Sequence, residues 1–189
     1  MRATSVMSEA IAPPRRSGAV STTWDADDAV EQLYASHYKQ LVRLSVLLVR
    51  NQETAEEVVQ DAFVAMHGKW RSLRDPDKAL AYLRQAVVNR SRSVLRRRGV
   101  ENKYVATQAG PLHVVPGADE NAVATEQRAR VLDALRQLPQ RQREVLALRY
   151  YLDLDEAAIA SALGISRGAV KSHASRGAST LRTLLEDRS

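Results

Sequence analysis

The chain has 189 residues, contains no cysteine and carries a formal net charge of +6. The lack of cysteine excludes a disulfide framework, a thiolate metal site and a cysteine nucleophile. A basic chain favours an anionic partner, such as nucleic acid, a membrane surface or an acidic protein. A basic protein without such a partner fits the charge equally well. The length allows one domain or two small ones.

The sequence contains no stretch that we expect to enter or cross a membrane. The longest apolar stretch, residues 44–49, is interrupted by Ser45 and falls far short of the roughly 18 residues that a spanning helix needs. The N-terminus carries arginines but lacks the apolar core of a secretory signal. We therefore expect a cytoplasmic protein without membrane insertion.

The first half of the chain divides into a tail and a helical domain. Residues 1–23 are rich in Ser, Thr, Ala and Pro, which predicts a disordered tail. Over residues 24–100, apolar residues recur every three or four positions, which predicts three packed helices. Their predicted boundary signals are a cap at Asp27 or Asp28 and an end at Asn51, a capping box at Thr54-Ala55-Glu56-Glu57, and a start at Asp75-Pro76 with an end at Gly99.

The second half begins after a linker. Residues 101–121 contain two Pro-Gly pairs and no periodicity, which predicts a flexible connection. Over residues 122–187 we predict a helix at 123–138, a helix that starts at Pro139, and a short and a long helix separated by Gly164. No segment has the period of a strand. The predicted fold is therefore all-α, with two small helical domains joined by a flexible linker.

Residues 156–166 have the pattern of a helix-turn-helix motif. The small Ala160 suits the contact between the two helices, Gly164 suits a left-handed turn, and Ser166 can cap the second helix. Apolar residues at the offsets that lock the helices together are Ile159, Leu163, Ile165 and Val170. Polar residues that the second helix would present to a major groove are Arg167, Lys171, Ser172, Ser175 and Arg176. An ordinary helical hairpin is the alternative, and the matching offsets favour DNA binding.

The helix predicted before the linker is strongly basic. Residues 78–100 include no acidic residue and seven basic ones: Lys78, Arg84, Arg90, Arg92, Arg96, Arg97 and Arg98. Like charges on one helix repel unless a polyanion neutralises them, so we favour nucleic acid over a solvated or membrane-surface helix. The preceding helix is acidic, which indicates either a second partner or intramolecular charge balance.

Four motifs together resemble those of the extracytoplasmic-function (ECF) RNA polymerase sigma factors, especially the actinobacterial SigE-like group. Residues 55–63 resemble the helix that binds the polymerase clamp, and residues 81–98 the helix that recognises and melts the minus-10 element. Residues 138–146 resemble the start of the second domain, and residues 159–176 the minus-35 helix-turn-helix. In this order and spacing, the motifs cover nearly all of residues 27–185.

The resemblance implies a transcription initiation factor whose partners are core RNA polymerase and promoter DNA, with an anti-sigma factor as a further candidate. It implies a region-2 domain at residues 24–100 and a region-4 domain at residues 122–187. Residues implied to bind polymerase are Glu57, Gln60, Asp61 and Phe63. Residues implied to bind the minus-10 element are Arg84, Asn89, Arg90, Arg92 and Arg96. Residues implied to bind the minus-35 element are Arg167, Lys171, Ser172 and Arg176.

The chain departs from the family pattern in its last helix, at His173, Ala174 and Gly177. These departures leave the packing and the base preference of the minus-35 contact open. A stand-alone helix-turn-helix regulator is the alternative function, and it would bind operator DNA without polymerase. A DNA-processing enzyme would need converging carboxylates or a catalytic serine-arginine set. Because the sequence lacks such a set, we expect no catalytic residue, no cofactor and no metal site.

Overall fold

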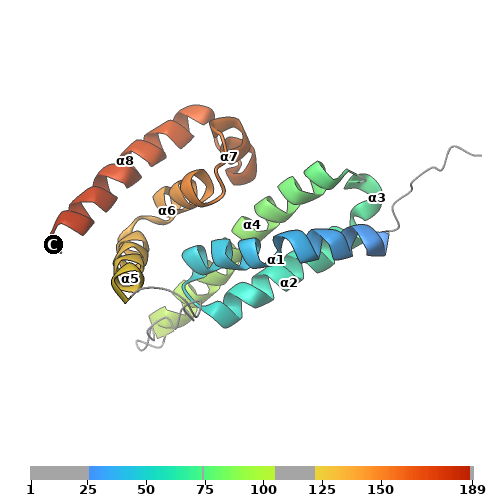
Figure 1. Cartoon of the computed structure of the whole chain (residues 1–189), viewed down its shortest axis with the longest axis horizontal. Coiled ribbons are helices and arrows are strands. Elements are labelled where there is room, and N and C mark those ends of the chain that lie inside the picture. Colours follow the sequence, from blue (N-terminus) through green and yellow to red (C-terminus); the bar gives the residue numbers. More distant parts are fainter. Residues whose placement is uncertain (1–25, 74, 105–121, 188–189) are drawn as a thin grey trace, which may run out of the picture.

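The computed structural model describes residues 26–73, 75–104 and 122–187, and every regular element in these ranges is helical, as predicted (Figure 1). The first part comprises α1 (Ala26–Val49), α2 (Gln52–Gly68), the short α3 (Trp70–Leu73) and α4 (Pro76–Tyr104). The second part comprises α5 (Ala122–Gln137), α6 (Gln140–Leu146), the π-helical turn η1 (Ala147–Tyr151), α7 (Glu156–Leu163) and α8 (Arg167–Glu186). The predicted tail, and the predicted linker from residue 105 to residue 121, lie outside the described residues.

The connection between α1 and α2 differs from the predicted capping box. Asn51 is the N-cap of α2, and its Oδ1 accepts a hydrogen bond of 2.7 Å from the backbone N–H of Thr54. Thr54 is buried within the first turn, and its hydroxyl accepts a hydrogen bond from Arg98. Arg50 has a φ of 66°, so the chain reverses there. Asn is at least as good a cap as Thr, so the helix starts one turn earlier than predicted.

The start of α4 agrees with the prediction and its end does not. Asp75 Oδ1 accepts a hydrogen bond of 3.0 Å from the N–H of Asp77, and Pro76 is the first helical residue. The helix continues through Gly99 to Tyr104. Glycine costs about 1 kcal/mol in a helix interior, which is too little to end an established helix by itself.

The first part packs around a core that α1, α2 and α4 build together. Its fully buried side chains include Leu41 and Leu44 of α1, Met66 of α2 and Leu83 of α4. Two buried serines also face each other across it, because Ser45 Oγ lies 3.3 Å from Ser91 Oγ.

The helix-turn-helix is confirmed in detail. Asp155 caps α7 by accepting a hydrogen bond of 2.7 Å from the N–H of Ala158. Gly164 takes the left-handed conformation with a φ of 63°, and the N–H of Ile165 bonds to the carbonyl of Ala160 at 3.1 Å. Ser166 then caps α8 by accepting from the N–H of Ala169 at 3.1 Å. These local signals fix the direction of α8 relative to α7.

The two parts lie against each other. The apolar core of α1, α2 and α4 is continuous with buried residues of the second part, among them Leu148 and Leu152. Polar contacts also cross the boundary: the Tyr151 hydroxyl donates to the carbonyl of Gln40 at 3.3 Å, and the Arg50 guanidinium donates to the carbonyl of Arg136. The prediction of two domains on a flexible linker did not include this packing.

Candidate nucleic-acid interface

The basic helix α4 exposes only some of its predicted DNA contacts. Asn89 and Arg96 are exposed, while Arg84, Arg90 and Arg92 are half-buried. The pattern follows from the helix period, because Leu83, Val87, Val88 and Ser91 point into the core and draw their neighbours toward it. All five polar residues lie on one helix, as predicted, but they differ in how far they are exposed to solvent.

Two of the half-buried arginines are engaged with carboxylates. Arg90 Nη1 lies 3.7 Å from Asp61 Oδ2, so a predicted minus-10 residue pairs with a predicted polymerase-binding residue of α2. Both of these side chains are partly exposed, and such pairs contribute little to stability. The acidic face of α2 therefore provides some intramolecular charge balance, as one of the two sequence-based interpretations held.

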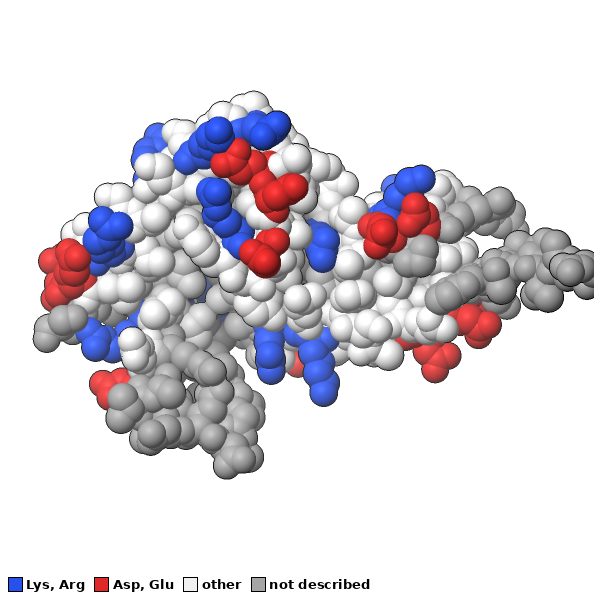
Figure 2. All heavy atoms as spheres, turned by 45° about the horizontal axis from the view of Figure 1, so that its top comes forward, with Lys and Arg blue, Asp and Glu red and all other residues white. Residues whose placement is uncertain are grey.

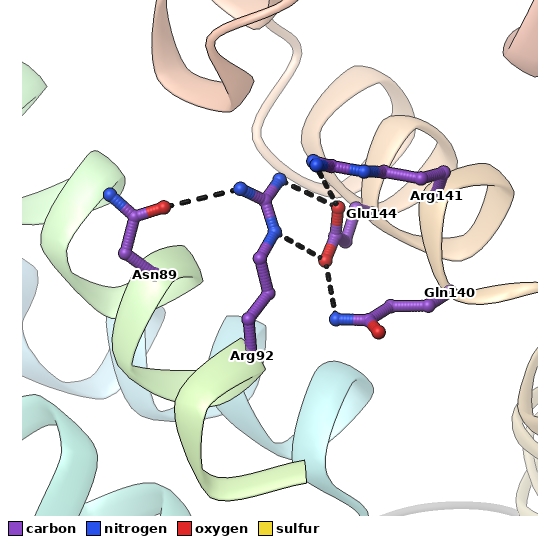
Figure 3. Close-up of polar contacts among 5 residues, drawn as sticks. All are labelled: Asn89, Arg92, Gln140, Arg141 and Glu144. Atoms are coloured by element: carbon purple, nitrogen blue, oxygen red, sulfur yellow. Dashed lines mark hydrogen bonds and ion pairs between the residues drawn. The ribbon is translucent and has the colours of Figure 1, made fainter. Parts of the chain in front are cut away.

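Arg92 is bound more tightly, and its partner belongs to the other part of the chain (Figure 3). Its Nε and Nη2 donate hydrogen bonds of 2.8 Å and 2.7 Å to the two carboxylate oxygens of Glu144 in α6. The carboxylate also accepts from Gln140 at 3.0 Å and lies 3.4 Å from Arg141 Nη1. Glu144 is only 1% exposed. This is a buried, bidentate ion pair between α4 and α6.

Two other arginines lie close to this boundary or to the core. Burial, together with the smaller effect of the neighbouring positive charge of Arg50, lowers the pKa of Arg143 to about 10, although Glu144 opposes the shift. Its Nη1 donates a hydrogen bond of 3.2 Å to the carbonyl of Arg136, at the negative end of α5. Burial also lowers the pKa of Arg84, whose Nε has no hydrogen-bond partner within the described part of the chain.

The outward face of α8 carries all four residues predicted to bind the minus-35 element. Arg167, Lys171, Ser172 and Arg176 are exposed. Lys171 Nζ lies 3.7 Å from Glu156 Oε2, and Arg149 Nη2 lies 3.5 Å from Glu156 Oε1. Glu156 therefore lies between two cations at the start of α7, a position that the sequence analysis did not single out.

The departures from the family pattern have a structural account. Ala174 is buried, and a Cβ added at Gly177 would lie 3.1 Å from Gln142 Cβ and 3.2 Å from Leu146 Cδ1. Small residues at these positions let α8 approach α6 closely. His173 is half-buried, and its Nδ1 has no hydrogen-bond partner among the described residues. The changes therefore affect the inner face of α8 and leave its outer face intact.

The predicted polymerase face of α2 is partly as expected. Glu57, Gln60 and Asp61 are exposed, whereas Phe63 is 5% exposed and packs edge-on against Tyr34, with ring centroids 5.1 Å apart. Beside it, Val64 is 73% exposed, although it is a large apolar residue. The exposure of Val64 could have been predicted from the helix period, because Glu57, Gln60 and Val64 are spaced by three and four residues and so lie on one face.

A further feature that the sequence analysis missed is an open, mainly apolar groove between η1 and the end of α8. Tyr150 at its edge is 72% exposed. The residues that line the groove are Leu146, Tyr150, Ala178, Leu181, Arg182, Leu185 and Glu186. An exposed apolar surface of this kind is typical of contacts with another protein.

The described residues show how charge is distributed over one face of the molecule and whether the requirements of a metal site or a membrane span are met. On the face shown in Figure 2, acidic and basic side chains are interspersed and do not form one basic patch. Over residues 26–73, 75–104 and 122–187, no three His, Asp or Glu side chains gather in a way that could hold a metal ion. In the same residues, no helix is both long and apolar enough to cross a membrane.

Two family models match the chain, one in each part. Residues 33–100 match the model "Sigma-70 region 2", and residues 128–181 match "Sigma-70, region 4". The chain is 31% identical to the RNA polymerase sigma-E factor of Streptomyces avermitilis over 160 residues, which cover 84% of this chain and 86% of that protein. It is 34% identical to the ECF RNA polymerase sigma factor SigM of Mycobacterium tuberculosis, over 83% of this chain and 77% of that one.

Solved structures agree with the fold. The sigma factor RpoE of Bartonella quintana, crystallised with the anti-sigma factor NepR, superposes with a TM-score of 0.69 at 23% identity and covers 82% of this chain and 96% of that chain. CnrH in complex with the cytosolic domain of CnrY gives a TM-score of 0.63 at 25% identity, with 87% and 96% covered. The chain belongs to the sigma-70 family of RNA polymerase sigma factors, in its ECF group. Its function is to direct promoter-specific initiation of transcription, as the sequence predicted.

Proposed function

We propose that the two parts divide the work as their family models suggest, with α4 binding the minus-10 element, α8 the minus-35 element and α2 the core polymerase. The observation that carries this proposal is the outward face of α8, where all four predicted minus-35 residues are exposed on a helix that Gly164 and Ser166 fix in place. Arg and Lys on such a helix suit guanine N7 and O6 in the major groove.

The proposal extends to the other predicted surfaces. The exposed residues Glu57, Gln60 and Asp61 supply an acidic face for a basic polymerase surface, and the exposed Val64 adds an apolar contact beside them. Asn89 and Arg96 are accessible for the minus-10 element, whereas Arg84, Arg90 and Arg92 need side-chain or interhelix movement. We assign the protein no enzymatic activity and place it in the cytoplasm, where promoter DNA is found.

An anti-sigma factor is a further proposed partner. Two structures with the same fold are complexes with such proteins, NepR in one case and CnrY in the other. In this chain the apolar groove between η1 and α8, with its exposed Tyr150, is a surface that a helix of a partner protein could cover. Tyr150→Asp should weaken binding of an anti-sigma factor and, because the ring is exposed, should leave the fold unchanged.

Transcription in vitro tests the function directly. Purified protein and bacterial core polymerase are incubated with a library of genomic promoter fragments, and the start sites of the transcripts are mapped. Discrete transcripts that need both proteins are expected, and the mapped promoters reveal both elements. Tight binding of duplex DNA by the protein alone, with no effect on core polymerase, would instead support a stand-alone regulator.

The polymerase face is tested by reversing its charge. Replacing Gln60 and Asp61 together by arginine should abolish binding to core polymerase while helicity is retained, because the basic polymerase surface would then meet two cations. The control makes the same two kinds of change on α1, with Glu31→Arg and Gln32→Arg, where both side chains are exposed. Equal binding by both double variants would remove α2 from the polymerase interface.

The minus-35 assignment is tested with Lys171→Ala. Loss of this exposed cation should weaken transcription from promoters that carry the mapped minus-35 element more than from promoters that lack it. Lys39→Ala, at an exposed position of α1, removes the same charge away from α8 and should have no such effect. An equal loss on both promoter classes would indicate that Lys171 contacts only phosphate.

A further inference from the structure

Glu156, the first residue of α7, lies between cations of two neighbouring elements. Its Oε2 lies 3.7 Å from Lys171 Nζ of α8, and its Oε1 lies 3.5 Å from Arg149 Nη2 of η1. The two cations thus meet different oxygens of one carboxylate. The side chain of Glu156 is 21% exposed and that of Lys171 is 65% exposed, so the surrounding atoms restrict the carboxylate more than the ammonium.

Arg149 anchors the carboxylate from the π-helical turn η1. Across this turn the N–H of Leu152 bonds to the carbonyl of Ala147, five positions earlier, at 3.4 Å. A turn of this kind differs in register from an α-helical turn, in which the bond spans four positions, and it occurs frequently at functional sites. Here it carries the guanidinium that pairs with the second oxygen of Glu156.

The arrangement belongs entirely to the second part of the chain. Its three members come from η1, α7 and α8, and the turn at Gly164 and the cap at Ser166 fix α8 relative to α7. None of the three side chains is supplied by α1–α4. The carboxylate therefore accompanies the outward face of α8 to any duplex that this face binds.

A lysine by itself discriminates poorly between bases and phosphates. Its ammonium is a compact charge on a flexible stem, so an unrestrained Lys171 reaches a phosphate as readily as a guanine edge. Only the base contact carries sequence information directly. A fixed carboxylate beside the ammonium narrows its range before DNA binds, which lowers the entropy that a base contact costs. Its negative charge also opposes the approach of a phosphate.

We propose that Glu156 is a positioning residue for minus-35 recognition, which orients Lys171 toward base edges and disfavours its binding to phosphate. The proposal rests on the proposed minus-35 role of Lys171. Because Glu156 acts through Lys171 and touches no base, its effect on sequence preference must vanish when Lys171 is removed. A carboxylate at the start of α7 also interacts favourably with the helix dipole, but that structural role has no such dependence.

The sequence preference is measured as a ratio of two affinities, with holoenzyme that contains the full chain. One promoter carries the minus-35 element mapped by transcription in vitro, and in the other that element is replaced by an unrelated sequence. Glu156→Gln keeps the size of the side chain and removes its charge. It should lower the ratio by about two- to fivefold, the effect of an ion pair near the surface, and raise the affinity for the second promoter.

Two further variants separate position from charge. Glu156→Asp keeps the charge and the interaction with the helix dipole but is one methylene shorter, so it should lower the ratio without raising the affinity for the second promoter. Asp153→Asn removes a negative charge at an exposed position just before α7 and should leave the ratio unchanged. Asparagine suits the φ of 51° at this position.

These variants also define what contradicts the positioning role. If Glu156→Asp keeps the full ratio, or if Asp153→Asn lowers it as much as Glu156→Gln does, the effect is one of net charge and the proposal is overturned. Helicity is followed by circular dichroism. Should Glu156→Gln lose helicity, Glu156→Asp takes its place in the experiment that follows.

A double-mutant cycle tests whether Glu156 acts through Lys171. In a chain that carries Lys171→Ala, the further change Glu156→Gln should lower the ratio no more. A second loss as large as the one in the parent chain would show that the carboxylate acts independently of Lys171, and the proposal would be overturned.

The positioning role and the minus-35 role fail in different ways. If Lys171→Ala leaves the ratio unchanged, Lys171 reads no base of the minus-35 element and the positioning role of Glu156 falls with that assignment. If Lys171→Ala lowers the ratio and Glu156→Gln does not, the minus-35 assignment is upheld and the positioning role alone is overturned.

Discussion

Gly177 of α8 packs directly against Leu146 of α6, so closely that a Cβ on the glycine would lie 3.2 Å from Leu146 Cδ1 and 3.1 Å from Gln142 Cβ. This seam sets the distance between α8 and the helix behind it. Because the outer face of α8 carries the proposed minus-35 residues, the seam also sets how far they project. Gly177, at which the chain departs from the family pattern, therefore lies where α8 meets α6.

Gly177→Ala should lower the free energy of unfolding by about 1 kcal/mol. Alanine gains about 1 kcal/mol in helix propensity, but overpacking a tight contact typically costs about 1–3 kcal/mol. Gly168→Ala is the control, because its Cβ would meet only Ser166 Oγ, at 3.9 Å. That variant should keep the propensity gain. Urea unfolding of the two variants measures the difference, and a Gly177→Ala protein at least as stable as Gly168→Ala would contradict the seam.

The buried serine pair can be tested with a double-mutant cycle. Ser45→Ala or Ser91→Ala alone should cost about 1–2 kcal/mol, because each leaves the other hydroxyl buried without its 3.3 Å partner. The double variant removes both polar groups and should cost less than the sum of the single changes. Thermal unfolding of the four proteins gives the coupling. Simple additivity would show that each hydroxyl is satisfied by its own helix backbone.

The cap of α8 allows stability and DNA binding to be separated. Ser166→Ala removes the acceptor for the N–H of Ala169 and should cost about 1 kcal/mol of stability. Ser166→Asp should keep the cap, since Asp155 already serves α7 in this way, yet its charge should weaken duplex binding. Melting temperature and the salt dependence of binding measure the two effects. Equal stability of the Ala and Asp variants would mean that the cap contributes nothing.

Stability should fall at high pH partly through Tyr151. Burial raises the pKa of this phenol, and the neighbouring Arg43 opposes the shift. The folded chain thus keeps a proton that the unfolded chain releases above about pH 10. The resulting stability is present below that pH and is lost as the pH rises through the folded-state pKa.

Tyr151→Phe should cost about 0.5–1.5 kcal/mol at pH 7, through loss of the bond to Gln40. Since phenylalanine does not titrate, the difference between parent and variant should shrink as the pH rises past 10. Urea unfolding at both pH values measures this, with Tyr150→Phe at an exposed ring as the control. A constant difference would show that Tyr151 does not contribute to the high-pH loss.

Local features of the fold could be predicted from sequence because their signals lie within one turn of each other. Gly164 and Ser166 identify the turn and the start of α8, and the structure confirms both. The same rules were wrong where two good caps compete, since Asn51 starts α2 ahead of Thr54. They also overstated Gly99, whose small cost does not end α4.

Features that depend on distant residues could not be predicted. Arg92 and Glu144 are separated by 52 positions, and nothing in either neighbourhood indicates the other. The sequence identified the charge of α4 and assigned it to DNA, but the accessibility of each arginine depends on how the second part packs. Phe63 shows the same limit, because the sequence around it does not indicate that its ring is buried against Tyr34 of α1.

The separation of Arg92 from Glu144 also has a consequence during synthesis. Ribosomes add about 5–20 residues per second, so the 52 positions between them take about 3–10 s. During that interval α1 and α2 have been made, and the carboxylate that pairs with Arg92 has not yet been added. A newly made chain therefore passes through a state in which Arg92 lacks this partner.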